Sequence, residues 1–153
     1  MVDWLIIVLY ACTLLGVTLI LASQNIVTLG PLHPLQGQLI AFLTLTLPVI
    51  LYSVLTESSS RHATIGKRAL KIRVSGSAGG IVLRNVIKFL PWEFAHAGIL
   101  WVNYIKDVET PVWIWALLIT PQVLVVCYLI SIIYTRGARS LYDSLAGTEV
   151  GSN

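Results

Sequence analysis

Three long hydrophobic runs divide the chain, over residues 4–22, 39–55 and 112–134. Each run is long enough for a helix to span a hydrocarbon core of about 30 Å. Pro48 interrupts the second run, so we expect a kink there, which lipid tolerates when a neighbouring helix satisfies the freed carbonyl group. The pattern predicts an all-α membrane protein, a helical bundle of three to four transmembrane helices with a polar cytoplasmic loop.

A fourth segment, residues 89–104, is hydrophobic but contains Glu93 and His96. Two placements remain open for it, a polar fourth crossing or a tilted helix in the membrane interface. We favour the crossing, because the charge distribution places both chain ends on one side and an even number of crossings follows.

That charge distribution is uneven, since seven of the ten basic residues fall in the polar segment 57–88. Basic loops stay on the cytoplasmic side. We therefore expect this loop and both termini to be cytoplasmic, the C-terminus being marked by Arg136 and Arg139. Residues 69–74 alternate polar and apolar side chains, which predicts either a short strand or an amphipathic turn within the loop.

The composition agrees with a membrane location. Of the 153 residues, 56% are hydrophobic and 11% are charged, against about 25% charged residues in soluble domains. So much apolar side chain needs lipid as a second apolar solvent. Nucleic-acid binding is not indicated, because the basic loop lacks interleaved aromatic residues.

Glu93 and His96 are the first candidates for chemistry, because their spacing of three places them on one helix face. A charged group in hydrocarbon costs at least about 2.5 kcal/mol, so it needs a reason to be there. Three roles remain open: a proton or cation relay, a metal ion bound by Glu93 and His96 with help from Glu57, His62 or Asp143, and a structural pair between helices. No cofactor other than such a metal ion is expected.

Asp3 and Asp143 are the other carboxylates of interest. Asp3 opens the first hydrophobic run, where it can act as a helix cap or as the partner of a cytoplasmic base. Asp143 follows Arg139 by four residues, a spacing that allows the two to pair on one turn of helix.

Two sequence blocks carry a family resemblance, ATIGKRALKIRV at 63–74 and SLYDSLAGTEV at 140–150, with Arg84 between them. Together they resemble the RDD family of small bacterial integral membrane proteins, and the likeness extends over the whole chain as a single domain, residues 1–153. The resemblance implies that Asp3 and Asp143 match the two aspartates of the family name. No arginine precedes Asp3 here, so the resemblance supplies no Arg–Asp pair at the first helix. It also implies a multi-pass protein of the bacterial cytoplasmic membrane.

Three functions are considered. The first is a small transporter or cation/proton antiporter component, acting as a homo-oligomer and using Glu93, His96, Asp3 and Asp143 as an ion or proton relay. The second is a non-catalytic accessory or assembly module whose loop binds a protein partner or anionic lipid. The third, less favoured, is a metal-dependent membrane enzyme. The residues expected to make structural, lipid or partner contacts are Thr64, Gly66, Lys67, Arg68, Arg84, Arg139 and Glu57.

Overall fold

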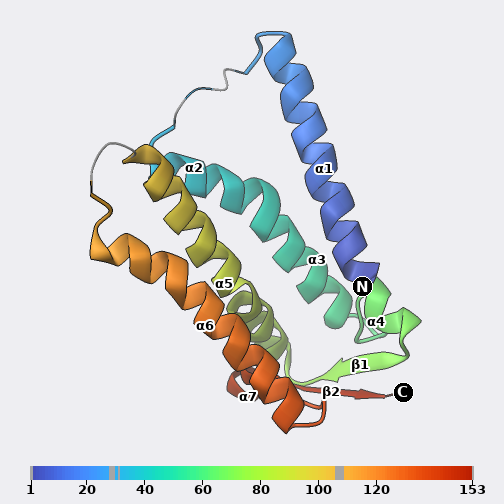
Figure 1. Cartoon of the computed structure of the whole chain (residues 1–153). Helices are drawn as coiled ribbons and strands as arrows, with labels where there is room; N and C mark the ends of the chain where they lie inside the picture. The colour runs from blue at the N-terminus through green and yellow to red at the C-terminus, as the bar shows by residue number, and fades with distance from the viewer. Residues whose placement is uncertain (1, 28–29, 31, 106–108, 153) are drawn as a thin grey trace.

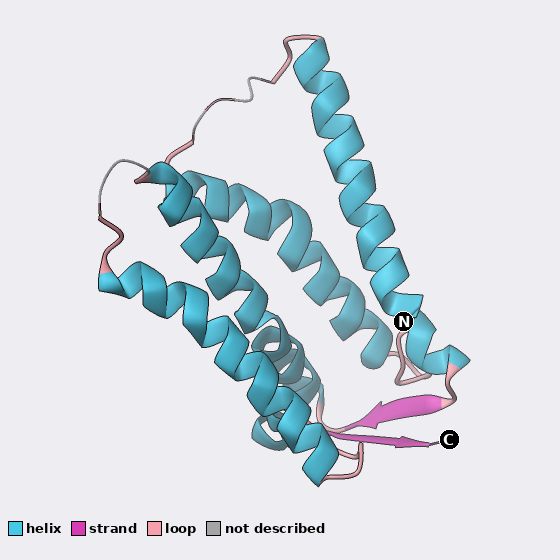
Figure 2. Ribbon diagram, viewed as in Figure 1, coloured by secondary structure: helices cyan, strands magenta, loops and turns pink. Residues whose placement is uncertain are grey.

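The structure is a computed structural model that describes residues 2–27, 30, 32–105 and 109–152. It is built mainly from helices (Figures 1 and 2). In chain order the elements are α1 (Val2–Ser23), α2 (Pro34–Ala41), the π-helix η1 (Phe42–Thr46), α3 (Leu47–Glu57), α4 (Ile65–Ala69), β1 (Ile72–Ser75), α5 (Ala78–Tyr104), α6 (Val112–Tyr134), α7 (Leu141–Ala146) and β2 (Glu149–Ser152).

Three helical segments among the described residues are long and apolar enough to cross a membrane. They are α1, the continuous stretch Pro34–Glu57 that contains α2, η1 and α3, and α6. These segments include the three predicted hydrophobic runs and extend the first two of them at both ends. The expectation of an all-α membrane fold is thereby confirmed.

The long helix α5 lies in the middle of the bundle. It packs against α6 on one side and against α2, η1 and α3 on the other. Helix α1 stands apart from this bundle in Figures 1 and 2 and has no fully buried residue. This central position brings the polar side chains of α5 between helices that are more apolar.

The kink predicted at Pro48 takes the form of a π-helix immediately before it. Pro48 has no N–H to donate to the carbonyl group of Thr44, four residues earlier. The hydroxyl of Tyr10 in α1 donates to that carbonyl oxygen at 2.6 Å. A neighbouring helix thus satisfies the freed carbonyl group, as the lipid environment requires.

Helix α5 repeats this arrangement at Pro91, which lies inside it. The carbonyl group left without a donor is that of Ile87. The hydroxyl of Tyr128 in α6 donates to its oxygen at 2.8 Å. Pro48 and Pro91 are therefore each accommodated by a tyrosine from another helix, a contact that also joins the two helices.

The start of α5 corrects the predicted boundary of the basic loop. Ser77 caps the helix by accepting a hydrogen bond from the amide of Gly80 at 3.0 Å. Residues 78–88 are thus helical, and the loop predicted over 57–88 ends before Ala78. The helix predicted over 89–104 begins eleven residues earlier. The glycines after Ser77 suggest a turn in the sequence, whereas the helix is stabilised by this cap and by the buried partners of Arg84.

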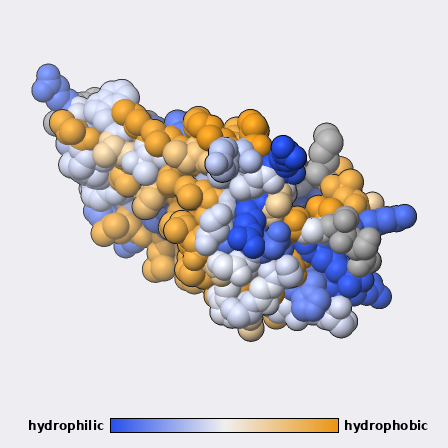
Figure 3. All heavy atoms as spheres, turned by 90° about the horizontal axis from the view of Figure 1, so that it is seen from below, coloured by the Kyte–Doolittle hydropathy of each residue, from blue (hydrophilic) through white to orange (hydrophobic). Residues whose placement is uncertain are grey.

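The small elements gather at one end of the bundle, where the N-terminal end of α1 and the strand β2 also lie (Figure 1). Strands β1 and β2 pair antiparallel, with Val74 opposite Val150 and Ser75 opposite Glu149. A strand, one of the two predicted alternatives, therefore forms near residues 69–74, over Ile72–Ser75. Viewed from below, polar residues gather beside strongly hydrophobic ones (Figure 3). We call the end of the bundle that contains α4, β1, α7 and β2 the polar end.

Candidate functional site

A buried group of charged side chains joins four elements at the polar end. Glu57, the last residue of α3, is completely buried. Its Oε1 accepts a hydrogen bond from Nζ of Lys67 at 2.5 Å. Its Oε2 accepts from Nη1 of Arg84 at 2.7 Å and from Nδ2 of Asn85 at 2.8 Å. We call these side chains, together with that of Asp143, the ionic cluster.

Asp143 completes the ionic cluster from α7. Its Oδ1 accepts from Nε of Arg84 at 2.5 Å and from the hydroxyl of Thr148 at 2.9 Å. Its Oδ2 accepts from the amide and hydroxyl of Ser140, while Ser140 Oγ accepts from the amide of Asp143. This capping box starts α7. One carboxylate therefore begins a helix and neutralises a buried arginine from another helix.

Charge balance explains how the ionic cluster can be buried. Two carboxylates, Glu57 and Asp143, face two cations, Lys67 and Arg84. Burial acts to raise the pKa of the Asp143 carboxyl, but Arg84 and the hydrogen bonds from Ser140 outweigh it and hold that pKa below its ordinary value. Burial lowers the pKa of the Lys67 ammonium, and the Arg84 guanidinium adds to this, although Glu57 opposes both effects. Such an arrangement fixes the relative positions of α3, α4, α5 and α7.

Asp3 makes a separate contact with the loop. Its Oδ2 accepts from the hydroxyl of Thr64 at 2.6 Å, and its Oδ1 accepts from the amide of Gly66 at 2.9 Å and from the hydroxyl of Tyr52 at 3.2 Å. A Cβ atom at Gly66 would lie 2.6 Å from Asp3 Oδ2. The glycine is therefore required by the close approach of the carboxylate. Thr64 and Gly66 thus serve to hold the start of α1 against α4.

Glu93 lies in a third polar group, further along α5. Its Oε2 accepts from Nε2 of Gln38 in α2 at 2.5 Å, and its Oε1 accepts from the hydroxyl of Thr46 in η1 at 2.5 Å. About 16 Å of helix separates Glu93 from Tyr104 at the end of α5, and the Glu93 side chain is half-buried. Within the described part of the chain, no cation pairs with this carboxylate. We call Glu93, Gln38 and Thr46 the Glu93 cluster.

Two buried polar atoms at or near the Glu93 cluster, Oε1 of Gln38 and Nδ1 of His96, find no hydrogen-bond partner among the described residues. Gln38 is itself a member of the cluster, and His96 follows Glu93 by one turn of α5. The imidazole of His96 lies beside the indole of Trp92, with ring centroids 6.1 Å apart. Buried polar groups are nearly always partnered, so each of these two atoms has capacity for one further hydrogen bond.

The four residues expected to form a relay do not lie in one site. Asp3 contacts α4, Asp143 contacts Arg84, and Glu93 contacts Gln38 and Thr46. No hydrogen bond joins Glu93 to His96 in the described structure. Arg139 and Asp143, whose spacing allows a pair, do not pair in the described structure. Arg139 lies on the surface and pairs with Glu149 at 2.9 Å, because Asp143 turns inward to cap α7.

Metal binding finds no ready-made ligand set. Among the residues that the structure describes, no three His, Cys, Asp or Glu side chains are placed to hold a metal ion. The suggested additional ligands Glu57 and Asp143 belong to the ionic cluster, where cations already neutralise them. His62 sits in the loop, with Nδ1 3.3 Å from the carbonyl oxygen of Glu57.

Sequence reasoning missed several of the partners. Each is a polar residue within an apolar stretch or directly beside a charged one, which is the signal that could have found it. They are Gln38, Thr46, Tyr52 and Asn85.

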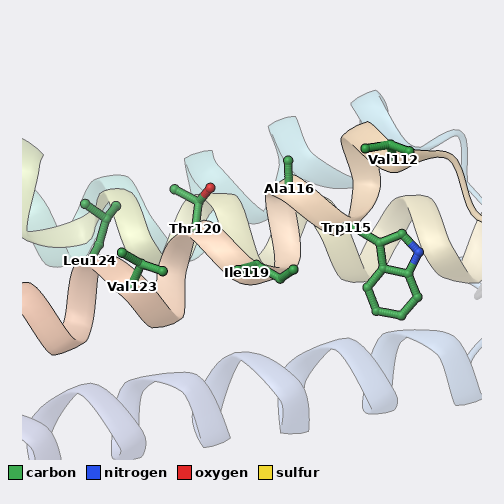
Figure 4. A pocket seen from close by; sticks show the side chains of 7 residues that line it. All are labelled: Val112, Trp115, Ala116, Ile119, Thr120, Val123 and Leu124. Atoms are coloured by element: carbon green, nitrogen blue, oxygen red, sulfur yellow. The ribbon is translucent and has the colours of Figure 1, made fainter.

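A shallow hollow of about 370 Å³ lies on α6, away from all of these groups (Figure 4). Trp115, Ile119 and Leu124 are among the side chains that line it, and Thr120 supplies its only side-chain hydroxyl. None of its lining side chains is ionisable. It therefore offers a surface for lipid and no acid–base chemistry.

Long apolar helices around a buried polar interior define an integral membrane protein of the helical-bundle class. The chain belongs to the RDD family, whose model matches residues 1–147. Neither curated proteins nor solved structures gave a match. The two sequence blocks of the family resemblance now have structural roles, since the first holds Asp3 and Glu57 and the second supplies Asp143 to Arg84.

Proposed function

We propose that this protein is a small membrane transporter component that moves a monovalent cation or a proton, with Glu93 as the residue that carries it. The observation that carries the proposal is the setting of Glu93. Its half-buried carboxylate has neutral hydrogen-bond donors but no cationic partner among the described residues. An ionised carboxylate in such a place is unfavourable unless it binds a cation or a proton.

The immediate neighbours of Glu93 suit this role. Carboxylate, amide and hydroxyl oxygens are ligands for hard cations, and Gln38 Oε1 is an unused buried acceptor. Thr46 belongs to a π-helix, a local irregularity often found at functional sites. His96 Nδ1, one turn away, is a second buried polar atom without a partner among the described residues.

The transport proposal includes a topology with four crossings. Helix α5 runs the length of the bundle between two apolar segments, which supports a crossing by this polar helix. Basic residues at the polar end support a cytoplasmic location for that end in a bacterial cell, together with both chain termini. Four helices enclose a narrow path, so transport by a homo-oligomer is part of the proposal.

The test is transport by reconstituted protein. Vesicles containing the full chain should exchange sodium or potassium ions against an imposed pH gradient. Glu93→Gln keeps the size of the side chain but removes its charge, and it should abolish this exchange. Glu109→Gln changes an exposed glutamate far from the cluster and should leave the exchange intact. Full exchange in a correctly folded Glu93→Gln protein would contradict the proposal.

A further inference from the structure

A second hollow, of about 310 Å³, lies in the loop at the polar end of the bundle. Four cationic side chains line it, those of Arg61, Arg68, Lys71 and Arg73, together with Ser60. Three of the four are exposed, and Arg68 is half-buried. We call this feature the basic hollow. It is distinct from the ionic cluster, to which none of these residues belongs.

The positive charge of the basic hollow is not neutralised within the described chain. None of its four cations forms an ion pair there. The carboxylates of the polar end are engaged elsewhere. Asp3 binds α4, Glu57 and Asp143 bind the ionic cluster, and Glu149 binds Arg139. The hollow thus keeps its full charge for an external anion.

The backbone around the basic hollow is held in place before any ligand binds. Two residues here, His62 and Lys71, have φ angles in the left-handed region, at 47° and 56°. Non-glycine residues adopt this conformation only where surrounding contacts enforce it. Here the amide of Val74 donates to the carbonyl oxygen of His62 at 2.8 Å, and Nε of Arg68 donates to that of Ala63 at 2.9 Å.

The hollow also lies beside apolar side chains exposed at the same end. Leu55 near the end of α3, Ile65 in α4 and Leu70 directly before Lys71 have 68%, 48% and 67% of their surface exposed. Exposed leucines and isoleucines next to cations are the pattern of a segment resting in the lipid headgroup region. The basic hollow is thereby placed at the depth of lipid phosphates.

We propose that the basic hollow binds the phosphate group of an anionic phospholipid of the surrounding membrane. Arg68 and Arg73 can donate paired hydrogen bonds to phosphate oxygens, and Arg61 and Lys71 add charge. The structure also changes which residues should be tested. Lys67 and Arg84, candidates from the sequence, are engaged with Glu57, so their removal would disturb the fold as well.

Full-length protein in a neutral detergent provides the test, with thermal stability measured as lipid is added. Phosphatidylglycerol should stabilise the protein and phosphatidylcholine should not. Lys71→Gln/Arg73→Gln should weaken the apparent affinity for phosphatidylglycerol about 25-fold, or about 1 kcal/mol for each cation removed. Lys71→Gln alone should weaken it about 5-fold. Arg136→Gln removes one exposed charge from the same end outside the hollow, and it should change the affinity little.

The remaining outcomes overturn the proposal. Equal losses in Lys71→Gln and Arg136→Gln would show attraction by overall charge and no site. Inorganic phosphate that stabilises the protein as well as phosphatidylglycerol does, with the same dependence on Lys71 and Arg73, would identify a soluble phosphate ligand in place of lipid. An unchanged affinity in the Lys71→Gln/Arg73→Gln protein would exclude the hollow altogether. None of these results bears on transport by Glu93, which is measured separately.

Discussion

Arg84 and Asp143 form a buried ion pair between residues 59 positions apart in the chain, with Nε of the arginine donating to Oδ1 of the aspartate. Each side chain has only 2% of its surface exposed. Removing one partner of such a pair leaves a buried charge without compensation, which costs about 3–5 kcal/mol. We expect Asp143→Ala to lower the free energy of unfolding by about this amount, measured by denaturation in detergent micelles.

The surface pair of Arg139 and Glu149 gives the matched control. Its two side chains are each 50% exposed, and exposed pairs contribute at most about 1 kcal/mol. Glu149→Ala should therefore have a small effect in the same assay. Equal losses for Glu149→Ala and Asp143→Ala would mean that Arg84 is not compensated as the structure indicates.

The same aspartate makes stability dependent on pH. Because the pKa of Asp143 is lower in the folded protein than its ordinary value of 3.8, its stabilising effect is fully present at neutral pH. As the pH falls below about 4, the unfolded chain takes up the proton first, and the stabilisation is lost as the pH approaches the folded pKa. Unfolding of wild type and Asp143→Asn should be compared from pH 7 to about pH 3, and only the wild type should show this component of the loss.

Tyr128 should stabilise the bundle only while Pro91 is present. Tyr128→Phe removes the donor to the carbonyl oxygen of Ile87 and should cost about 1–3 kcal/mol, because that oxygen then has no partner. In a Pro91→Ala background the new amide of residue 91 can donate to the same oxygen. The effect of Tyr128→Phe should then shrink, and a double-mutant cycle measures the difference. Strictly additive effects would refute the coupling.

Gly66→Ala tests the contact of Asp3 with α4. The added Cβ would lie 2.6 Å from Oδ2 of Asp3, so the start of α1 must move away from α4. Overpacking of this kind costs about 1–3 kcal/mol. We expect faster proteolysis of the loop and weaker disulfide cross-linking between cysteines placed at Trp4 and Ile65. Gly37→Ala, where a Cβ finds ordinary contacts at 3.5 Å, is the control.

The long helices could be predicted from the sequence because lipid imposes a simple rule on them. A run such as 112–134 must be apolar over its whole length, and that property is visible residue by residue. The sequence also predicts that a neighbouring helix supplies a donor near Pro48, since the carbonyl group freed by the proline needs one. The identity of the donor, Tyr10, depends on the packing of α1 and was not predictable from local sequence.

The candidate site was only partly predictable, and the reason is spatial. Glu93 stood out because a charge in an apolar segment is visible in the sequence. Its neighbours Gln38 and Thr46 lie 55 and 47 residues away, and no local pattern joins them. Arg139 and Asp143 show the opposite error, because a favourable spacing of four suggested a pair that the capping of α7 excludes.

The ionic cluster also sets an order of events during synthesis. A ribosome releases the chain from its N-terminal end, so Arg84 emerges well before Asp143, its partner 59 residues later. Until then Glu57 is the one carboxylate of the ionic cluster that can pair with the arginine, and the Nε side of the guanidinium must stay hydrated. The ionic cluster can therefore be completed only after α7 has been synthesised. Folding of this last helix is then the step that completes the packing of the polar end.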